Sequence, residues 1–289
     1  MSLPISVIIL TYNEEKNIEA CLKSVSDFAQ DIFIIDSFST DKTLEIARGY
    51  TNNIIQHSFE TQAKQFNWAL DNVEINTDWV MRLDADERVS EELAKELNDK
   101  LHNFSKDITG LYIKRRVYFM DHFIRHGGYY PTWLLRIWRT GKARSEEQIL
   151  NEHIILLEGK TANLKHDIID WNKKGLGFWI DKHNSFAERF AKEIIAIKDG
   201  SIKDVTLIDA SIFGTQEERK RWLKQNLYVH LPMFVRCLLY FVYRYFLRLG
   251  FLDGLQGLIF HFLHGFWYLF LVDAKIYELE LEKRYVTKR

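Results

Sequence analysis

The sequence predicts an α/β fold in which a mainly parallel sheet, flanked by helices, is followed by a helical, aromatic-rich C-terminal extension. Two observations predict it. Strand-like and helix-like segments alternate four times within the first hundred residues, and right-handed crossovers then favour a parallel sheet. Residues 226–272 hold 14 Phe, Trp or Tyr in 47 positions, against 14% aromatic residues in the whole chain. That shift marks the clearest boundary in the sequence.

Four short segments are the predicted strands of the first half, at residues 4–10, 32–35, 53–57 and 79–83. The apolar runs at 4–10 and 32–35 are typical of strands buried on both faces. An amphipathic segment follows each predicted strand, which predicts four intervening helices. Thr11 with Glu14 fits a capping box for the first helix, and Asn13 is another N-cap candidate.

The second half changes in pattern after Gly110. Residues 111–119 alternate between apolar and polar and predict a longer strand, and residues 134–138 and 163–169 predict two more. Between the first two of these lies a loop rich in glycine and aromatic residues at 122–131. A helix is predicted over 179–197, and residues 215–221 form a charged lead-in to the aromatic segment.

Composition bounds the class of protein. With 289 residues, 47% hydrophobic and 27% charged, the chain can bury a core in one large domain or one plus an appendage. A net charge of −1 gives no electrostatic case for a nucleic-acid partner. The two cysteines, Cys21 and Cys237, lie far apart, which suits a reducing compartment. Because the N-terminus lacks the features of a signal peptide, we expect a cytoplasmic location.

Three carboxylates, Asp84, Asp86 and Glu87, follow the strand predicted at residues 79–83. The carboxyl ends of parallel strands are where ligands bind in open α/β sheets. Crowded carboxylates repel one another unless a cation lies between them, and Mg²⁺ or Mn²⁺ accepts carboxylate and phosphate oxygens together. The alternative is a polar turn that caps the next helix, with Ser90 as its N-cap. The sequence contains neither a dinucleotide fingerprint nor a Walker loop.

These motifs, taken in order, resemble the inverting glycosyltransferases of family 2, which have the GT-A fold. The resemblance covers roughly residues 3 to 190 and rests on six stretches: 11–14 (TYNE), 36–43 (DSFSTDKT), 84–87 (DADE), 127–131 (GGYYP), 136–139 (RIWR) and 151–153 (NEH). Within the family the chain most resembles bacterial enzymes that act on lipopolysaccharide core or a related envelope glycan. It departs from the family at Phe66, where Arg is common, and at Asn151-Glu152, where His-Glu is common.

The resemblance implies a GT-A catalytic domain at residues 1–214, with a nucleotide-binding half at about 1–105 and an acceptor half at about 106–214. Residues 215–289 then form a helical region that associates with membrane or mediates oligomerisation. The implied activity is metal-dependent, inverting transfer of a sugar from a nucleotide-sugar donor, UDP-linked, to an envelope-glycan acceptor.

The resemblance also assigns residues to the metal and the donor. Asp86 is the first choice as ligand of Mg²⁺ or Mn²⁺, Asp84 holds the ribose or shares the metal, and His166 completes the shell or is simply hydrogen-bonded. Asp36 accepts a hydrogen bond from the base or, alternatively, caps the following turn. The residues expected to line the donor site are Thr11, Tyr12, Glu14, Asp36, Gln65, Asp84, Ala85 and Asp86.

The general base is expected at Glu152, and Glu146 and Glu147 lie close enough in sequence to compete. Its task is to deprotonate the acceptor hydroxyl on the side opposite the leaving group. Arg136 and Arg139 are expected either to clamp phosphate or to form salt bridges within the domain.

The aromatic segment predicts contact with a membrane surface. Residues 254–272 carry no Asp, Glu, Lys or Arg, yet Gln256, two histidines and three glycines weaken a spanning helix. Aromatic residues with spaced arginines suit helices that lie at the membrane interface. We therefore expect peripheral association with the inner face of the cell membrane, with a homo-oligomer contact and a true span as alternatives.

Two other functions fit parts of the pattern. A nucleotidyltransferase shares such a sheet and metal, but residues 12–14 offer neither the glycines nor the lysine of its usual loop. A sugar-nucleotide-binding scaffold without activity is the third possibility, against which the intact Asp84, Asp86 and Glu152 argue.

Overall fold

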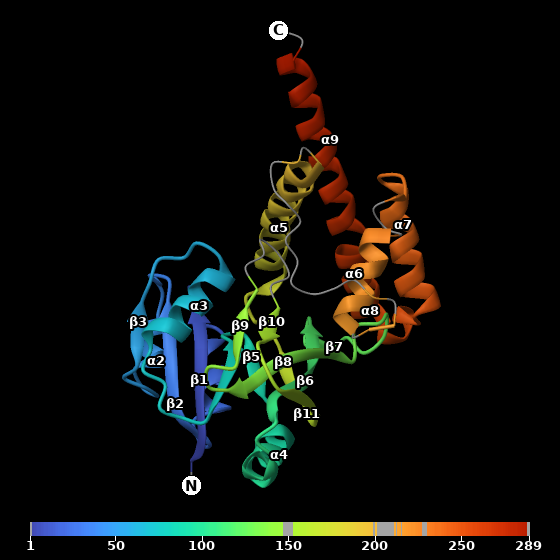
Figure 1. The fold of residues 1–289 in the computed structure, drawn as a ribbon. Helices are drawn as coiled ribbons and strands as arrows, with labels where there is room; N and C mark the ends of the chain where they lie inside the picture. Colours follow the sequence, from blue (N-terminus) through green and yellow to red (C-terminus); the bar gives the residue numbers. More distant parts are fainter. Residues whose placement is uncertain are drawn as a thin grey trace. The chain divides into compact units, whose positions relative to one another are not determined.

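The computed structural model describes residues 2–146, 153–198, 200, 211, 213–214, 216–226 and 230–287 (Figure 1). The chain forms two compact units. Among the described residues, the sheet unit comprises residues 2–121, 130–146 and 153–174, and the helical unit comprises residues 122–129 and those from 175 onward. The predicted division between residues 214 and 215 differs from this one, because the helix after the sheet already belongs to the helical unit.

The sheet unit is built on the mixed α/β sheet that the sequence predicts. Its strand order is β3-β2-β1-β4-β8-β6-β11-β5. The strands are β1 (Leu3–Thr11), β2 (Ala29–Asp36), β3 (Ile54–Gln56), β4 (Trp79–Asp84), β5 (Glu87–Val89), β6 (Ile108–Phe119), β8 (Thr132–Arg139) and β11 (Lys160–Asp170). Strands β1 to β4 pair in parallel, and β11 pairs in parallel with β6. Strand β8 runs antiparallel to both β4 and β6, and β5 runs antiparallel to β11.

Strand β1 shows why the predicted runs become central strands. Alternate residues of its apolar run enter opposite faces of the sheet, so that Val7 and Ile9 join one core cluster and Ile8 the other. All three side chains are fully buried. The helices that follow the first strands are α1 (Ile18–Lys23), α2 (Thr43–Ala47), α3 (Gln62–Asn72) and α4 (Glu91–Lys100), with a 3₁₀ turn, η1 (Leu101–Asn103), after α4. A separate two-stranded sheet joins β9 (Ala143–Ser145) and β10 (Ile154–Leu156).

Helix starts test the predicted caps. The side chain of Ser90 accepts a hydrogen bond from the backbone N–H of Leu93, which confirms Ser90 as the N-cap of α4. The capping box at Thr11 is wrong, because Thr11 is the last residue of β1 and α1 begins at Ile18. The strand continues to Thr11 because its hydroxyl finds a buried acceptor on β2 instead of a helix N–H.

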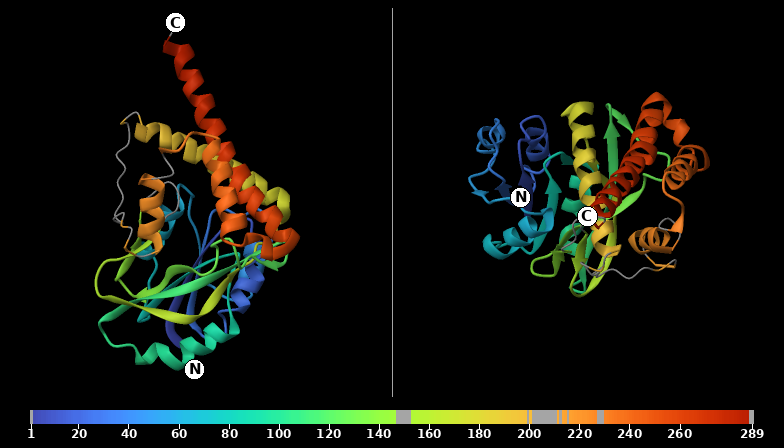
Figure 2. Two further views of the ribbon diagram at one scale, coloured as in Figure 1. Left: turned by 90° about the vertical axis from the view of Figure 1, so that its right-hand side faces the viewer. Right: turned by 90° about the horizontal axis from the view of Figure 1, so that it is seen from above.

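The helical unit consists of one short strand, β7 (His122–Phe123), and a series of helices: α5 (Gly175–Lys198), α6 (Gln216–Asn226), α7 (Val235–Val242), η3 (Tyr243–Leu247), η4 (Gly250–Asp253), α8 (Gly254–Phe260), η5 (His261–Trp267) and α9 (Tyr268–Thr287). Elements η3 and η5 are π-helical. Helices α5 and α9 lie side by side (Figure 2). Ala187 and Ala191 of α5 pack with Val272 and Ile276 of α9 in an apolar cluster.

The interior of the helical unit also holds charged and polar groups. Arg236 and Asp273 form a buried ion pair, and the Arg244 guanidinium donates to the carbonyl of Gly127 over 2.7 Å. Gly127 has φ +67°, and a Cβ there would fall 2.1 Å from the ring of His261. The expectation that the spaced arginines lie at a membrane interface is therefore wrong for Arg236 and Arg244. Both are about 7% exposed, since each satisfies a buried acceptor of the unit.

Candidate active site at the carboxyl ends of the parallel strands

The register of the sheet brings three of the predicted motifs to one edge. Thr11 at the end of β1 is paired with Asp36 at the end of β2. On the other side of β1, Leu10 is paired with Asp84 at the end of β4. Ligands bind at this edge in parallel α/β sheets, because the loops that follow the strands converge there. The motifs separated by up to 73 positions in sequence, from Thr11 to Asp84, thus form one cluster.

Asp36 is fully buried and all its hydrogen bonds are to neighbouring protein groups. One oxygen accepts from the hydroxyls of Thr11, at 3.0 Å, and Ser39. The other accepts from the backbone N–H of Ser39, at 2.9 Å, and from the Gln56 amide, at 3.1 Å. The turn-capping alternative for Asp36 is therefore present in the structure. A base contact would require one of these donors to give way, and it stays a prediction.

Two other predicted donor residues, Tyr12 and Gln65, lie directly after β1 and on α3. Tyr12 is 58% exposed, so its ring can be approached by a flat base. Gln65 on α3 is buried and bonds with the hydroxyl of Ser37 in the loop after β2. Phe38, in the same loop, is 54% exposed with φ 60°. Phe38 was not predicted from the sequence, because an exposed aromatic residue in a loop carries no periodic signal.

The acidic turn after β4 is organised by buried arginines. Arg136 on β8 donates to Asp84 Oδ2 over 3.1 Å and to Glu87 Oε1 over 2.6 Å, and the backbone N–H of Asp84 donates to Glu87 Oε2. Arg82 reaches the other oxygen of Asp84 at 3.4 Å. Of the two alternatives for Arg136, the structure thus has the internal salt bridge. Arg139 likewise turns inward, donating to the carbonyls of Ile108 and Phe104.

This network sets the ionisation of the turn. Burial by itself would raise the pKa of Asp84, but the positive charges of Arg136 and Arg82 outweigh it and hold that pKa well below its usual range. Burial raises the pKa of Glu87 to about 7, and the neighbouring Asp84 charge adds to the rise while Arg136 opposes it. Asp84 is therefore ionised, and its negative charge is already balanced by two guanidinium groups.

Asp86 has a different environment from Asp84. Its Oδ2 accepts a hydrogen bond from the side-chain amide of Asn172 over 2.9 Å, and its carbonyl accepts from the backbone N–H of Trp171. Both donors belong to the segment that follows β11. Next to them, Lys174 pairs with Glu14 at 2.6 Å. The role of this segment was not predicted, because nothing in the stretch 171–174 (WNKK) indicates which strand end it meets.

His166 is not brought to the acidic turn. It lies on β11, and its backbone N–H donates to Glu96 Oε2 of α4. The β11 residue opposite Glu87 is Asp170, and His166 precedes Asp170 by four positions, which correspond to roughly 13 Å along a strand. The prediction of His166 as a metal ligand thus has no geometric support from the described residues.

The chemistry of the donor set fits a cation that arrives with its substrate. Among the described residues, no three His, Cys, Asp or Glu side chains form a group that could hold a metal ion. Mg²⁺ is usually bound through one or two carboxylates plus substrate phosphates, not in an all-protein cage. Asp86 is half-buried after the strand end and has no arginine partner among the described residues, so it meets that requirement better than Asp84 does.

Of the three candidates for the general base, only Glu146 lies within the described residues. Glu152 and Glu147 lie outside the described residues, so their placement stays a prediction. Glu146 is buried, and its backbone N–H donates to the carbonyl of His153. A buried carboxylate is a poor candidate for a base that must reach an acceptor hydroxyl, which favours the other two.

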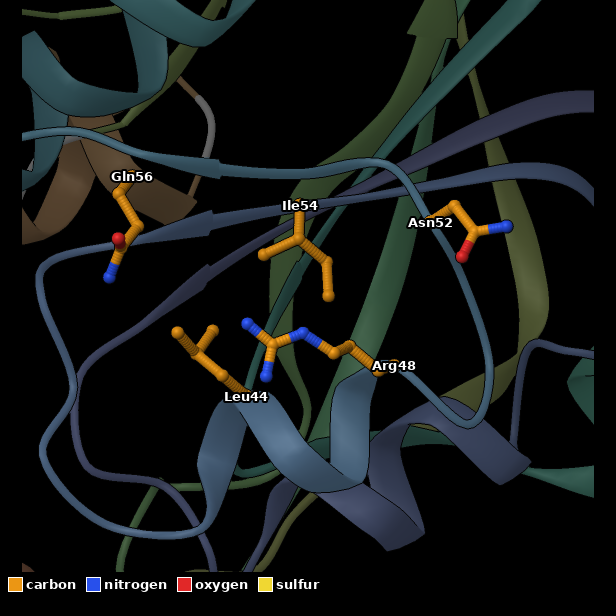
Figure 3. Close-up of a pocket in the computed structure, with 5 residues that line it drawn as sticks. All are labelled: Leu44, Arg48, Asn52, Ile54 and Gln56. Atoms are coloured by element: carbon orange, nitrogen blue, oxygen red, sulfur yellow. The ribbon is translucent and has the colours of Figure 1, made fainter.

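A pocket of about 250 Å³ lies between α2 and the edge strand β3 (Figure 3). Its lining residues are Leu44, Arg48, Asn52, Ile54 and Gln56. None of the residues predicted to bind the donor lines it, although Gln56 bonds with Asp36. We therefore place the candidate site at the acidic turn and not in this pocket.

Comparison with known proteins decides the family. The sequence profile of glycosyl transferase family 2 matches residues 6–157, which is more than half of the chain. The chain belongs to glycosyl transferase family 2. It is a glycosyltransferase, and the GT-A class of fold expected from the sequence is confirmed by its mixed sheet.

Two relatives of this family 2 chain illustrate its range. An uncharacterized glycosyltransferase of Rickettsia typhi is 26% identical over 98% of this chain and 89% of the relative. A lipopolysaccharide core biosynthesis glycosyltransferase, LpsC, of Rhizobium meliloti is 31% identical over 56% of this chain and 61% of LpsC. The chain thus spans less than two thirds of the length of LpsC.

Solved structures similar to this family 2 enzyme include Staphylococcus aureus TarS 1–349 in complex with UDP-GlcNAc, at 17% identity and a TM-score of 0.42 over 98% of this chain and 92% of that one. Another is glucosyl-3-phosphoglycerate synthase from Mycobacterium tuberculosis with Mg²⁺ and UDP, at 21% identity and a TM-score of 0.32 over 39% and 43% of the two chains.

Proposed function

We propose that this glycosyltransferase is a metal-dependent, inverting enzyme that moves a sugar from a UDP-linked donor to a lipopolysaccharide or other envelope-glycan acceptor. The observation that carries the proposal is the convergence of Thr11, Asp36 and Asp84 at one sheet edge, with Asp86 directly after them. The named role of LpsC in lipopolysaccharide core biosynthesis supports the acceptor class.

In this proposal Asp86 holds the metal ion, and Asp84 holds the ribose or shares the metal. A bound Mg²⁺ or Mn²⁺ supplies positive charge to the departing diphosphate. Asn172 keeps the Asp86 carboxylate oriented through its amide, and the arginine network keeps Asp84 ionised. Tyr12 covers the nucleobase with its ring. Asp36 accepts a hydrogen bond from an N–H of the nucleobase once a neighbouring donor moves aside.

Transfer itself needs one proton acceptor from the chain. Glu152 takes the proton of the acceptor hydroxyl as that oxygen bonds to the anomeric carbon, while the bond from the same carbon to the diphosphate oxygen breaks on the opposite face. One bond forms and one breaks in line, so the configuration inverts. The assignment of Glu152 rests on the resemblance to family 2, with Glu147 as its competitor.

A panel of sugar nucleotides tests the donor. The protein is mixed with each sugar nucleotide and Mn²⁺ and scored for thermal stabilisation and slow donor hydrolysis. Stabilisation by a UDP-linked sugar, lost on addition of EDTA and weakened in Asp86→Ala, is the expected result. Formation of a sugar nucleotide and pyrophosphate from a nucleoside triphosphate and a sugar 1-phosphate would instead indicate a nucleotidyltransferase, and binding without any turnover would indicate a scaffold.

The helical unit supports a site of action at the cytoplasmic face of the membrane. Residues 235–262 expose many apolar side chains, among them Leu247 at 72% and Leu255 at 67%. Between residues 226 and 272 the single acidic residue is Asp253, which is buried with His126, whereas Arg248 is exposed. An apolar surface without exposed carboxylates suits an anionic lipid surface. By length and composition the helical stretch Gly250–Lys283 could also cross a membrane, with 28% of its most apolar window buried.

Point substitutions test the membrane contact better than truncation, because α9 packs on α5 through the apolar cluster of the helical unit. We expect the wild type to sediment with liposomes that contain anionic lipid, and the Leu247→Asp/Leu255→Asp variant to stay in solution. Lys283→Asp, at the far end of α9, is the matched charge control and should sediment like the wild type. A double variant that turns an oligomer into a monomer, with no liposome binding by the wild type, would make this surface an assembly contact.

A further inference from the structure

The segment after β11, residues 171–174, folds against two of the site's loops. Asn172 holds the Asp86 carboxylate, and the backbone N–H of Trp171 holds the Asp86 carbonyl. The backbone N–H of Lys173 donates to Asn17 Oδ1 at the start of α1 over 2.8 Å. Asn172 Oδ1 in turn accepts from the backbone N–H of Lys174. Asn172 thus donates to Asp86 through its side-chain Nδ2 and accepts from Lys174 through its side-chain Oδ1. These two hydrogen bonds fix the backbone of Lys174 relative to Asp86.

Lys174 carries its positive charge into a region rich in carboxylates. Its Nζ lies 2.6 Å from Glu14 Oε1, and the two side chains are 12% and 15% exposed. Burial raises the pKa of Glu14; Lys174 and Asn17 oppose that rise, and the nearby Asp86 charge adds to it. Burial opposes a fall in the pKa of Asp41 in the loop before α2, but hydrogen bonds from Thr43 and Glu15 lower that pKa, and the charge of Lys174 adds to the fall. Lys174 therefore interacts electrostatically with Glu14 and Asp41, and Glu14 in turn interacts with Asp86.

The carboxylates at this edge of the sheet oppose the binding of a nucleoside diphosphate. Its phosphates are negative, and the carboxylates of the site repel them. The guanidinium groups of Arg82 and Arg136 are held by Asp84 and Glu87. A divalent ion at Asp86 offsets part of the repulsion, and a lysine on the same side offsets more. Lysine is a common phosphate-binding residue because its ammonium group acts as a compact, mobile point charge.

We propose that Lys174 binds the diphosphate of the donor, and that Asn172 positions it by joining its backbone to Asp86. The inference rests on the proposed function, since it assumes that a nucleotide diphosphate binds beside Asp86. In the absence of donor, Glu14 holds the ammonium group in place. On binding, the diphosphate oxygens share or replace that contact.

The test compares uridine, UMP and UDP as ligands by calorimetry in the presence of Mn²⁺. For Lys174→Gln we expect the dissociation constant of UDP to rise about tenfold or more, as for the loss of one hydrogen bond to a charged group. The dissociation constant of uridine should not change, because the base and ribose contacts remain. Lys174→Arg should recover most of the UDP affinity. Lys173→Gln is the matched control, because Lys173 Nζ is directed to Asp121 and to the ring of Trp171.

A second variant separates the loss of a positive charge at the diphosphate from a disturbance of the loop around Glu14. Lys174→Gln leaves Glu14 without its cation, which by itself could disturb the loop. The double variant Glu14→Gln/Lys174→Gln removes both charges and should fold while still binding UDP weakly. If the double variant regains wild-type affinity for UDP, Lys174 only satisfies Glu14 and the inference is overturned. Unchanged UDP affinity in Lys174→Gln would overturn it too, with the proposed function intact. A wild type that binds no uridine nucleotide would overturn the proposed function together with the inference.

Discussion

The acidic edge of the sheet unit and the interior of the helical unit both bury charged side chains, but to different effect. In the sheet unit, Arg136 is shared between Asp84 and Glu87, and the turn they form presents Asp86 at the strand end. In the helical unit, Asp273 is paired with Arg236, and its carboxylate also accepts from the backbone N–H of Phe234 just before α7. The first arrangement organises a site, whereas the second ties one helix end to another helix.

The two units also differ in how much of their apolar side-chain surface is exposed. Central strands of the sheet unit bury nearly every apolar residue, as the fully buried Ile8 and Ile34 illustrate. The helical unit leaves large apolar residues such as Leu247 and Phe246 more than half exposed. The buried charges at the acidic turn of the sheet unit therefore belong to the candidate active site, whereas the buried ion pair of the helical unit stabilises its fold. In the helical unit the exposed apolar surface is the candidate for function. The following experiments break or sharpen that contrast.

The largest effect is expected from Glu152→Gln, which removes the proposed base from the sheet unit's site. Transfer to acceptor should slow by about 10²–10⁴, as for a lost general base. Donor binding should be unchanged, because the amide has the same shape. Steady-state transfer and calorimetric donor binding check both parts. The same pattern in Glu147→Gln or Glu146→Gln would relocate the base, and an equal loss of donor affinity would make Glu152 structural.

Asp86→Ala should reduce transfer by about 10²–10³ at saturating Mn²⁺, as for the loss of one preorganised electrostatic contact in the transition state. The melting temperature should change little, since Asp86 is half-buried and its one side-chain partner, Asn172, can turn to water. Asp71→Ala, which breaks an exposed pair with Arg144 far from the turn, is the control. More than a tenth of wild-type activity in Asp86→Ala would contradict the metal assignment.

Asp273→Asn should destabilise the helical unit by about 3–5 kcal/mol, because it leaves the buried Arg236 guanidinium without its counter-charge. Glu278→Gln, on an exposed position of the same helix, should have little effect. Urea unfolding followed by far-UV circular dichroism, which reports mainly on the helices, measures the change. The contrast between the units predicts that UDP affinity survives in Asp273→Asn. A parallel loss of UDP affinity would show that the two units do not behave separately.

A smaller effect is expected from pH on the same unit. Burial lowers the pKa of His261 to about 4, with Arg244 and His126 adding to the fall and Asp253 opposing it. Between pH 6.5 and 4 the unfolded chain binds a proton that the folded unit does not, so stability falls as pH falls through that window. From pH 7 to pH 5 the loss is about 2 kcal/mol for this one group. His261→Asn should flatten the pH dependence of urea unfolding, and an unchanged slope would assign it to other groups, His183 first.

The sequence by itself determined seven of the strands and the order of the motifs, whereas the short strands β5, β7, β9 and β10 were not predicted. The β-branched run at residues 4–10 is a central strand because few other structures bury such a short, mostly apolar segment. Ser90 was identified correctly as a helix N-cap because capping depends on residues three positions apart. Local chemistry of this kind can be recognised without knowing what lies across the sheet.

Tertiary structure decided which polar groups meet. Thr11 bonds with Asp36 rather than capping a helix, because the β1–β2 register places a buried carboxylate opposite it. Arg136 serves Asp84 and Glu87, and Asn172 serves Asp86, across 52, 49 and 86 positions of sequence. Arg236 and Arg244 turn inward for the same reason. A partner that far along the chain is selected by strand register and helix packing, which depend on all the contacts of the fold together and leave no signal in the neighbouring residues.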